Sequence, residues 1–163
     1  MACILSSLSG MAAEQAKIAS STRGAVEKLE AVNVLGLPVR YATGKSLEEH
    51  RQRALRAAAR VVKELELLHS RQSLEVKFLL AGDLRSLYDS MEDLALGLGA
   101  QAIEPERLQL QATTWMSAVS DAAGPVHEAM RVFEGEFQRD LESADDQLRR
   151  CKGDAEDHKV VTH

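Results

Sequence analysis

The sequence predicts an all-α fold, and three observations carry that prediction. Leu, Ala, Glu and Arg, which are strong helix formers, are abundant. No run of Val, Ile and Thr in strict alternation is present to suggest a strand. Apolar residues recur every three or four positions over long stretches, which is the spacing of one helix face. We therefore expect an elongated, antiparallel, coiled-coil-like bundle of three helices, one shorter and two long.

The length, composition and net charge of the chain limit the classes of protein to consider. The 163 residues suffice for one domain; we expect it to span residues 1–152, with residues 153–163 as a polar, disordered tail. The net charge of −5 argues against general affinity for nucleic acid or anionic membrane. No stretch approaches the ~20 apolar residues of a membrane span, and the first residues lack the pattern of a signal peptide. The predicted location is the cytoplasm, with Cys3 and Cys151 as reduced thiols.

The first predicted helix runs from about residue 4 to residue 34. Its apolar row has the four-three spacing of a heptad, interrupted by Gln15 and Thr22. These two residues either fix the register or lie on a poorly buried edge, and we favour the edge. Gly36 and Pro38 end the helix. The row is Ile4, Leu8, Met11, Gln15, Ile18, Thr22, Ala25, Leu29 and Val32.

The second predicted helix begins after Ser46, which forms a capping box with Glu49. Gly44-Lys45-Ser46 also matches the end of a phosphate-binding loop, but position 39 is Val where that loop needs Gly. No proline occurs between residues 47 and 98, which would make one helix on the order of 80 Å long. The polar run 69–73 is either a turn or part of that helix. Because it contains no Gly, Pro, Asn or Asp, we favour the single helix.

The last predicted helix carries the longest apolar row, from Leu108 to Cys151. The row keeps its phase through Gly124-Pro125, where a helix would be expected to break. An unbroken phase favours a kink near Pro125 over a reversal of the chain. The row is Leu108, Ala112, Trp115, Val119, Ala122, Val126, Met130, Phe133, Phe137, Leu141, Ala144, Leu148 and Cys151.

The charge pattern suggests how the long helices pair. A basic stretch covers residues 51–63, and an acidic run covers residues 134–146. If the two long helices fold antiparallel about a turn at 99–104, residues 51–63 lie beside residues 140–152, and opposite charges set the register. We expect the acidic run to be a solvated helix face.

This pairing leaves the distal part of the hairpin uncovered, because the first helix is too short to reach it. Large exposed apolar patches usually mark interaction sites. We therefore predict a surface that a protein partner or a second copy of the chain buries by helix-in-groove contact. The predicted partner-binding residues are Phe78, Leu80, Leu84, Leu87, Trp115 and Val119.

No constellation for catalysis, cofactor binding or metal binding is found in the sequence. Glu49-His50 and His127-Glu128 lack the Glu-x-x-His spacing of a di-metal bundle and are expected at the surface. Trp115 and Met116 occur at the helical spacing of core residues, so we expect them in the core rather than at a cofactor site. We therefore predict a non-enzymatic interaction or scaffold protein without a cofactor, metal, small-molecule substrate or nucleic-acid partner.

An alternative function remains open. One short and two long, kinked helices are similar in outline to BAR-type membrane-binding dimers. That resemblance rests on architecture alone, without a shared motif, and it implies a membrane-binding or curvature-sensing module.

Overall fold

The computed structural model describes residues 12–34, 37, 46–99 and 106–161, with side chains as far as residue 153. These residues form four helices and no strand: α1 (Ala12–Glu30), α2 (Leu47–Ser70), α3 (Leu74–Gly99) and α4 (Glu106–Val161). The all-α prediction is therefore confirmed. The predicted number of three helices is wrong. The predicted turns at 36–45 and 99–104 fall almost wholly outside the described residues, as does the part of the first helix before Ala12.

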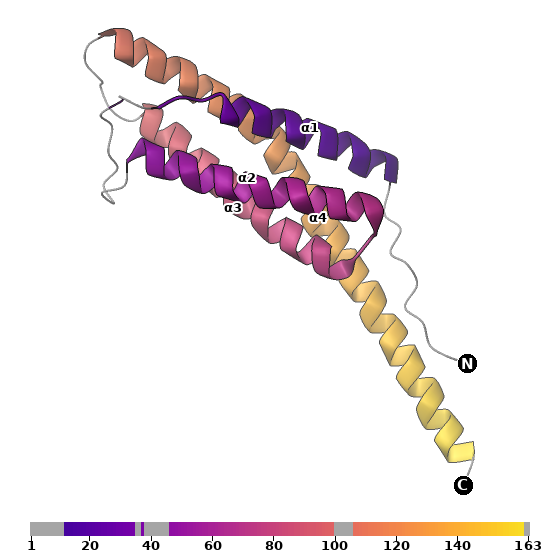
Figure 1. The fold of residues 1–163 in the computed structure, drawn as a ribbon. Coiled ribbons are helices and arrows are strands. Elements are labelled where there is room, and N and C mark those ends of the chain that lie inside the picture. Colours follow the sequence, from indigo (N-terminus) through magenta and orange to yellow (C-terminus); the bar gives the residue numbers. More distant parts are fainter. Residues whose placement is uncertain (1–11, 35–36, 38–45, 100–105, 162–163) are drawn as a thin grey trace.

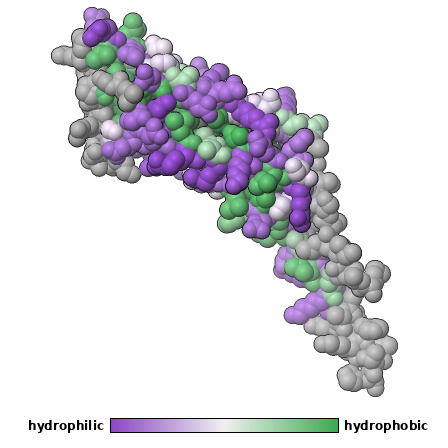
Figure 2. Space-filling model, viewed as in Figure 1, coloured by the Kyte–Doolittle hydropathy of each residue, from purple (hydrophilic) through white to green (hydrophobic). Residues whose placement is uncertain are grey.

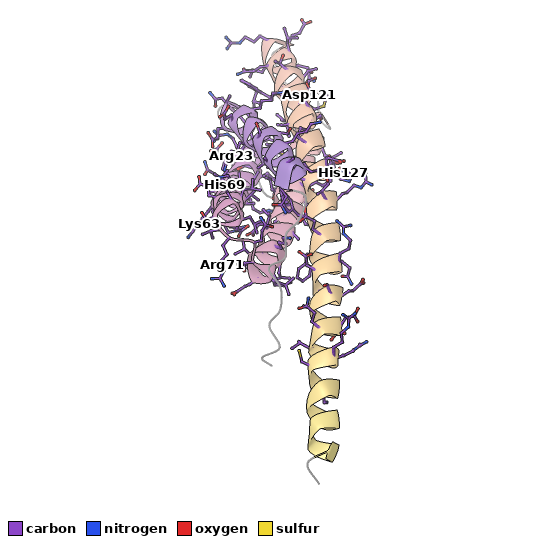
Figure 3. The ribbon with its side chains drawn as sticks, turned by 90° about the vertical axis from the view of Figure 1, so that its right-hand side faces the viewer. Arg23, Lys63, His69, Arg71, Asp121 and His127 are labelled. Atoms are coloured by element: carbon purple, nitrogen blue, oxygen red, sulfur yellow. The ribbon has the colours of Figure 1, made fainter. Side chains whose placement is uncertain are left out.

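The four helices alternate in direction, so that each packs antiparallel to its neighbours (Figure 1). α3 lies between α2 and α4, and α1 completes the ring by packing on α4 and, less closely, on α2. No Cα atom of α2 comes within 8 Å of one in α4. The predicted pairing of residues 51–63 with residues 140–152 is therefore wrong, and Lys63 and Arg71 lie on the side of the bundle away from α4 (Figure 3).

A turn at residues 71–73 divides the predicted long helix into α2 and α3. Arg71 ends α2 with extended backbone angles, φ −154° and ψ 123°. Ser73 then begins α3 by accepting a hydrogen bond from the backbone N–H of Val76 at 3.4 Å. Serine is a preferred helix N-cap, and Glu75 suits the positive end of the new helix dipole. Ser73 and Glu75 were the signals in the sequence for this helix start. The absence of Gly and Pro from residues 69–73 favoured a single helix instead.

The start of α2 agrees with the sequence prediction. Ser46 is the N-cap, and its Oγ accepts a hydrogen bond from the backbone N–H of Glu49 at 3.2 Å. Arg51, one turn later, donates to the carbonyl oxygens of Val32 at 2.6 Å and Glu30 at 3.2 Å. An arginine from α2 thus satisfies carbonyl groups that the end of α1 leaves without helical partners.

Gln15 and Thr22 are both buried in α1, so the prediction that they lie on an exposed edge is wrong. The hydroxyl of Thr22 donates to the carbonyl of Ile18 at 2.7 Å, which satisfies it within the helix. Gln15 instead bonds to Glu136 of α4 and to Gln72 in the turn between α2 and α3. The alternative interpretation, in which a polar residue fixes the register, fits Gln15.

α4 is one continuous helix through Gly124 and Pro125, as the unbroken apolar phase predicts. Figure 1 shows it changing direction along its length, and Pro125 lies inside the helix. Its first half packs in the bundle, and its second half extends beyond the ends of the other helices (Figures 1 and 3). We call residues 141–161 the arm. The helix continues to Val161, where the sequence predicted a disordered tail from residue 153.

The core lies along the axis of the four-helix bundle and consists mainly of Leu, Val and Ala. The helices approach closely near the α3–α4 connection, where a Cβ atom on Gly99 would lie 2.6 Å from Sδ of Met116. Leu84 of α3 is fully buried in the core, whereas Leu96 of the same helix is exposed.

Replacing Leu84 by alanine should lower the free energy of unfolding by about 2–5 kcal/mol, because it leaves a cavity in a packed core. Leu96→Ala is the matched control and should change it by less than about 0.5 kcal/mol. Urea denaturation followed by circular dichroism measures both variants. Equal, small effects would show that Leu84 is not in the core.

Candidate functional site

The six predicted partner-binding residues do not share one surface. Leu80, Leu84, Leu87 and Val119 are fully buried in the protein's own core, so their assignment to a docking surface is wrong. Trp115 is half-buried and packs against that core. Phe78 alone is well exposed, at 59% of its surface.

The turn at residues 71–73 explains the difference. A single helix over residues 47–98 would have left the distal half of the hairpin with two helices and an open apolar side. Because the chain folds back, α2 covers α3 along its length, and α1 covers α4 on the other side. Large apolar side chains remain exposed at both ends of the bundle, and most of them lie at the end where α3 begins and the arm leaves.

A buried ion cluster holds α3 and α4 together at that end. The ammonium group of Lys77 has no exposed surface and lies 3.0 Å from Oε1 of Glu136. It also forms an ion pair with Asp140, one helical turn further along α4. The expectation that the acidic run is solvated is therefore wrong for Glu136, which is buried, and for Asp140, which is mostly covered.

Two glutamines extend this cluster to the other helices. The side-chain amide of Gln15, in α1, donates to Oε1 of Glu136 at 2.6 Å and to Gln72 at 3.1 Å. Gln72, in the α2–α3 turn, donates in return to Gln15 at 2.9 Å and to the carbonyl of Leu68 at 2.9 Å. One connected group thus joins all four helices. We call it the polar cluster: Gln15, Gln72, Lys77, Glu136 and Asp140.

The polar cluster fixes the point at which α4 leaves the bundle. Removing a buried charge from its partners costs several kcal/mol, because the remaining charge has no solvent to stabilise it. Sliding α4 by one turn would separate Lys77 from one of its two carboxylates. The base of the arm is therefore held in one register.

Apolar side chains surround the base of the arm on the outside. The rings of Phe78 and Phe137 are in contact, with centroids 5.4 Å apart. Leu79 in α3 and Leu67 in α2 are also exposed, and Figure 2 shows apolar surface at this end of the bundle as well as elsewhere on the same face. Beyond Phe137 the arm continues the row with Leu141 and Leu148, which are 41% and 56% exposed. We call Phe137, Leu141, Ala144 and Leu148 the apolar row.

Charges on the described part of the arm are segregated along its length. Glu142, Asp145 and Asp146 lie in its first two turns, and basic residues follow them. Within the helix, Arg149 pairs with Asp145 at 2.8 Å, but both side chains remain largely exposed. The basic residues are Arg149, Arg150 and Lys152.

A second buried carboxyl lies between α2 and α3, away from the arm. Burial, together with a hydrogen bond to Asp83 and the charge of that residue, raises the pKa of Glu64 to about 8. Burial alone would raise the pKa of Asp83 too, but hydrogen bonds with Glu64 and Arg60 outweigh that effect and lower it. Glu64 therefore carries a proton at neutral pH and donates it to the Asp83 carboxylate, while Arg60 lies 2.9 Å from Asp83.

Two basic residues of α2 form ion pairs with carboxylates of α3. Arg60 pairs with Asp83, and Arg53 pairs with Asp93 at 3.3 Å.

His50 is buried, so its predicted surface position is wrong. The ring of His127 lies 4.9 Å from that of Tyr88. Among the described residues, no group of three or more His, Cys, Asp or Glu side chains could hold a metal ion.

Cys151 is disulfide-bonded in the structure, so the prediction of a reduced thiol at this position is wrong. Cys3, the other predicted thiol, lies outside the described residues. No helix in the described part of the chain is long and apolar enough to cross a membrane. The cytoplasmic location stays a prediction.

Comparison with models of protein families, with curated proteins and with solved structures finds no match for this chain.

Replacing Lys77 by methionine should lower the free energy of unfolding by about 3–5 kcal/mol, because Glu136 and Asp140 would keep their charges without a buried cation. The triple variant Lys77→Met/Glu136→Gln/Asp140→Asn should recover most of that loss. The matched control is Arg85→Met, which removes an exposed α3–α4 ion pair with Glu134 and should cost no more than about 1 kcal/mol. Equal costs for Lys77→Met and Arg85→Met in urea denaturation would contradict the buried cluster.

Glu64→Gln should change how stability depends on pH. Between pH 4.5 and about 8 the folded protein keeps a proton on Glu64 that the unfolded chain releases. The contribution of Glu64 to stability is therefore complete at low pH and is lost as the pH rises through this window. The unfolding free energy of Glu64→Gln, relative to the unsubstituted protein, should rise over the same window. Glu66→Gln, at an exposed position of α2, should show no such trend.

Proposed function

We propose that this chain is a non-enzymatic helical interaction protein that assembles by pairing its arm with the arm of a second copy. The observation that carries the proposal is the arm itself, which extends beyond the bundle with large apolar residues exposed along one face. A lone helix in water gains little stability from propensity alone, and helices with an apolar face are usually stabilised by packing. The arm therefore offers a surface that favours a helical partner.

Charge complementarity favours a second copy in antiparallel orientation. In that orientation the basic residues 149–152 of one arm lie beside the acidic residues 142–146 of the other. A pair centred on Leu148 places the two Leu148 side chains together and Arg150 of each copy beside Asp146 of its partner. A twofold axis repeats each of these contacts, as expected of a symmetric dimer. A parallel pair would instead place like charges side by side.

The proposed dimer would be weak and reversible. The apolar row has only a few layers, and an interface of this size belongs with transient contacts rather than obligate ones. The polar cluster supports assembly by holding the base of the arm in one direction, so that less freedom is lost on pairing. This is an interaction role in which no residue performs chemistry.

We do not favour the BAR-like alternative. It rested on an outline of one short and two long helices, and the described chain has four helices instead. The basic residues of α2 that could have met a membrane are partly engaged by Asp83 and Asp93 of α3.

Leu148→Asp should weaken self-association by at least about tenfold, equivalent to ~1.4 kcal/mol, because it places a charge in the paired row. Sedimentation equilibrium in reducing buffer, over increasing protein concentration, measures the dissociation constant. Leu110→Asp is the matched control, since Leu110 is exposed on the bundle half of the same helix. A monomer at every concentration in the unsubstituted protein would refute the dimer.

Charge reversal tests the antiparallel orientation. One variant changes Arg149, Arg150 and Lys152 to Glu, and a second changes Glu142, Asp145 and Asp146 to Lys. Each variant alone should be monomeric, because its arms then carry charge of one sign. An equimolar mixture should form a heterodimer. Failure of the mixture to associate, while the unsubstituted protein dimerises, would rule out this orientation.

A further inference from the structure

We propose that a cavity between α1, α2 and α4 binds a small primary amine in its ammonium form, with an apolar group about the size of one aromatic ring. The cavity has a volume of about 250 Å³, and two residues of the polar cluster, Gln15 and Gln72, line it. It lies between α1 and α2, which pack on each other less closely than α1 packs on α4. The site does not include the apolar row of the arm, so it stands or falls independently of the proposed dimer.

Most of the cavity wall is apolar. Leu65 and Leu68 of α2 and Phe133 of α4 line it, and all three side chains are buried. On the side of α1 the lining residues are Ala16 and Ala19, whose small side chains leave room for a ligand. The volume lies just below the range of about 300–1,000 Å³ that is typical of small-molecule pockets. The walls therefore suit a small apolar group, such as a single ring.

The polar part of the wall offers only hydrogen-bond acceptors. A carboxamide has two N–H donors and an oxygen with two lone pairs. Gln15 donates to Glu136 and to Gln72, and Gln72 donates to Gln15 and to the carbonyl of Leu68, so all four N–H groups are used. Among the described residues, each carboxamide oxygen accepts one hydrogen bond and has a second lone pair to offer. A ligand held by both oxygens must therefore be a donor.

The charge of the polar cluster favours a cationic donor. Lys77 supplies one positive charge, whereas Glu136 and Asp140 supply two negative charges, which leaves one negative charge in excess. Glu136 is only 3% exposed, and its Oε2 atom has no hydrogen-bond partner among the described residues. An uncompensated charge is costly where water is excluded. A cation on the Gln15 oxygen would be joined to Glu136 through the Gln15 carboxamide, and the two hydrogen bonds would strengthen each other.

An ammonium group meets both requirements, because it has three donors, no acceptor and a positive charge. A bare metal ion fits less well, since the described residues bring no group of three His, Cys, Asp or Glu side chains together and the rest of the wall is apolar. In a primary amine with one ring on a short chain, the ammonium would donate to Gln15 and Gln72. The ring would lie against Phe133 and the leucines of α2.

Titration of the full-length chain with 2-phenylethylamine, followed by two-dimensional NMR, tests the site. The matched neutral probe is 2-phenylethanol, which has the same ring and chain length. The amine should bind at least tenfold more tightly than the alcohol, because only the amine is charged at neutral pH. Equal dissociation constants for the two probes, or no saturable shift with the amine, would overturn the proposal.

A pair of isosteric variants tests the role of the buried charge. Glu136→Gln removes the excess negative charge while Lys77 keeps Asp140 as its partner, and it should abolish the preference for the amine. Glu134→Gln is the matched control, because it neutralises a more exposed carboxylate of the same helix. It should leave both dissociation constants unchanged. Equal losses in the two variants would show that the amine responds only to the general charge of α4, and the site would be refuted.

The position of the probe is measured on the unsubstituted protein, so it does not depend on a variant that folds. Nuclear Overhauser cross-peaks should join the ring protons of 2-phenylethylamine to the methyl groups of Leu65 and Leu68. Cross-peaks to Phe78 and Leu79 in their place would locate the probe on the exposed apolar surface and would overturn the cavity as the site.

Filling the cavity gives an independent check. Ala19→Phe should remove the cross-peaks and the saturable shifts, because the new ring occupies the space of the ligand. Ala13→Phe places the same ring at an exposed position of α1 that does not line the cavity, and it should leave binding intact. Binding that survives Ala19→Phe unchanged would contradict the proposal.

Discussion

A lysine ammonium with no exposed surface constrains the whole structure, because its charge has to be balanced where it lies. Lys77 meets this requirement with two carboxylates on α4, one turn apart. Gln15 bonds to one of these carboxylates and also to Gln72, so α1 and the α2–α3 turn are tied to the same point. Apolar packing alone would allow the helices to slide by a turn. The polar cluster prevents such sliding. It therefore sets both the register of the bundle and the place where the arm leaves it.

Much of the helical content could be predicted from the sequence, because periodicity and capping are local properties. Ser46 begins α2 through its bond to Glu49, and α4 continues through Pro125 as its apolar phase required. The turn at 71–73 could not be predicted with the same rules. The row through Leu68, Gln72 and Val76 keeps helical spacing across the turn, so periodicity does not mark it. A single serine cap was too weak a signal against the absence of Gly and Pro.

The candidate site was predicted only in part, and the missed turn is the reason. In the predicted hairpin of two long helices, no other helix covered Leu84 and Val119. They were therefore assigned to a docking surface. With four helices they are core residues. Phe78 remains at the surface because it lies beside the first turn of α3, next to Phe137 at the base of the arm. Lys77 was missed altogether, since a pattern of apolar residues treats every lysine as solvated and only the carboxylates of another helix make its burial possible.

The most direct test of the central claim is a nuclear Overhauser measurement on the side-chain amide of Gln15. If the polar cluster joins the four helices, these protons should exchange slowly and give cross-peaks to the side chains of Gln72 and Glu136, which lie 3.1 Å and 2.6 Å from Nε2. A rapidly exchanging amide without cross-peaks to either residue would contradict the account. The bundle would then lack its fixed register, and the arm its defined base.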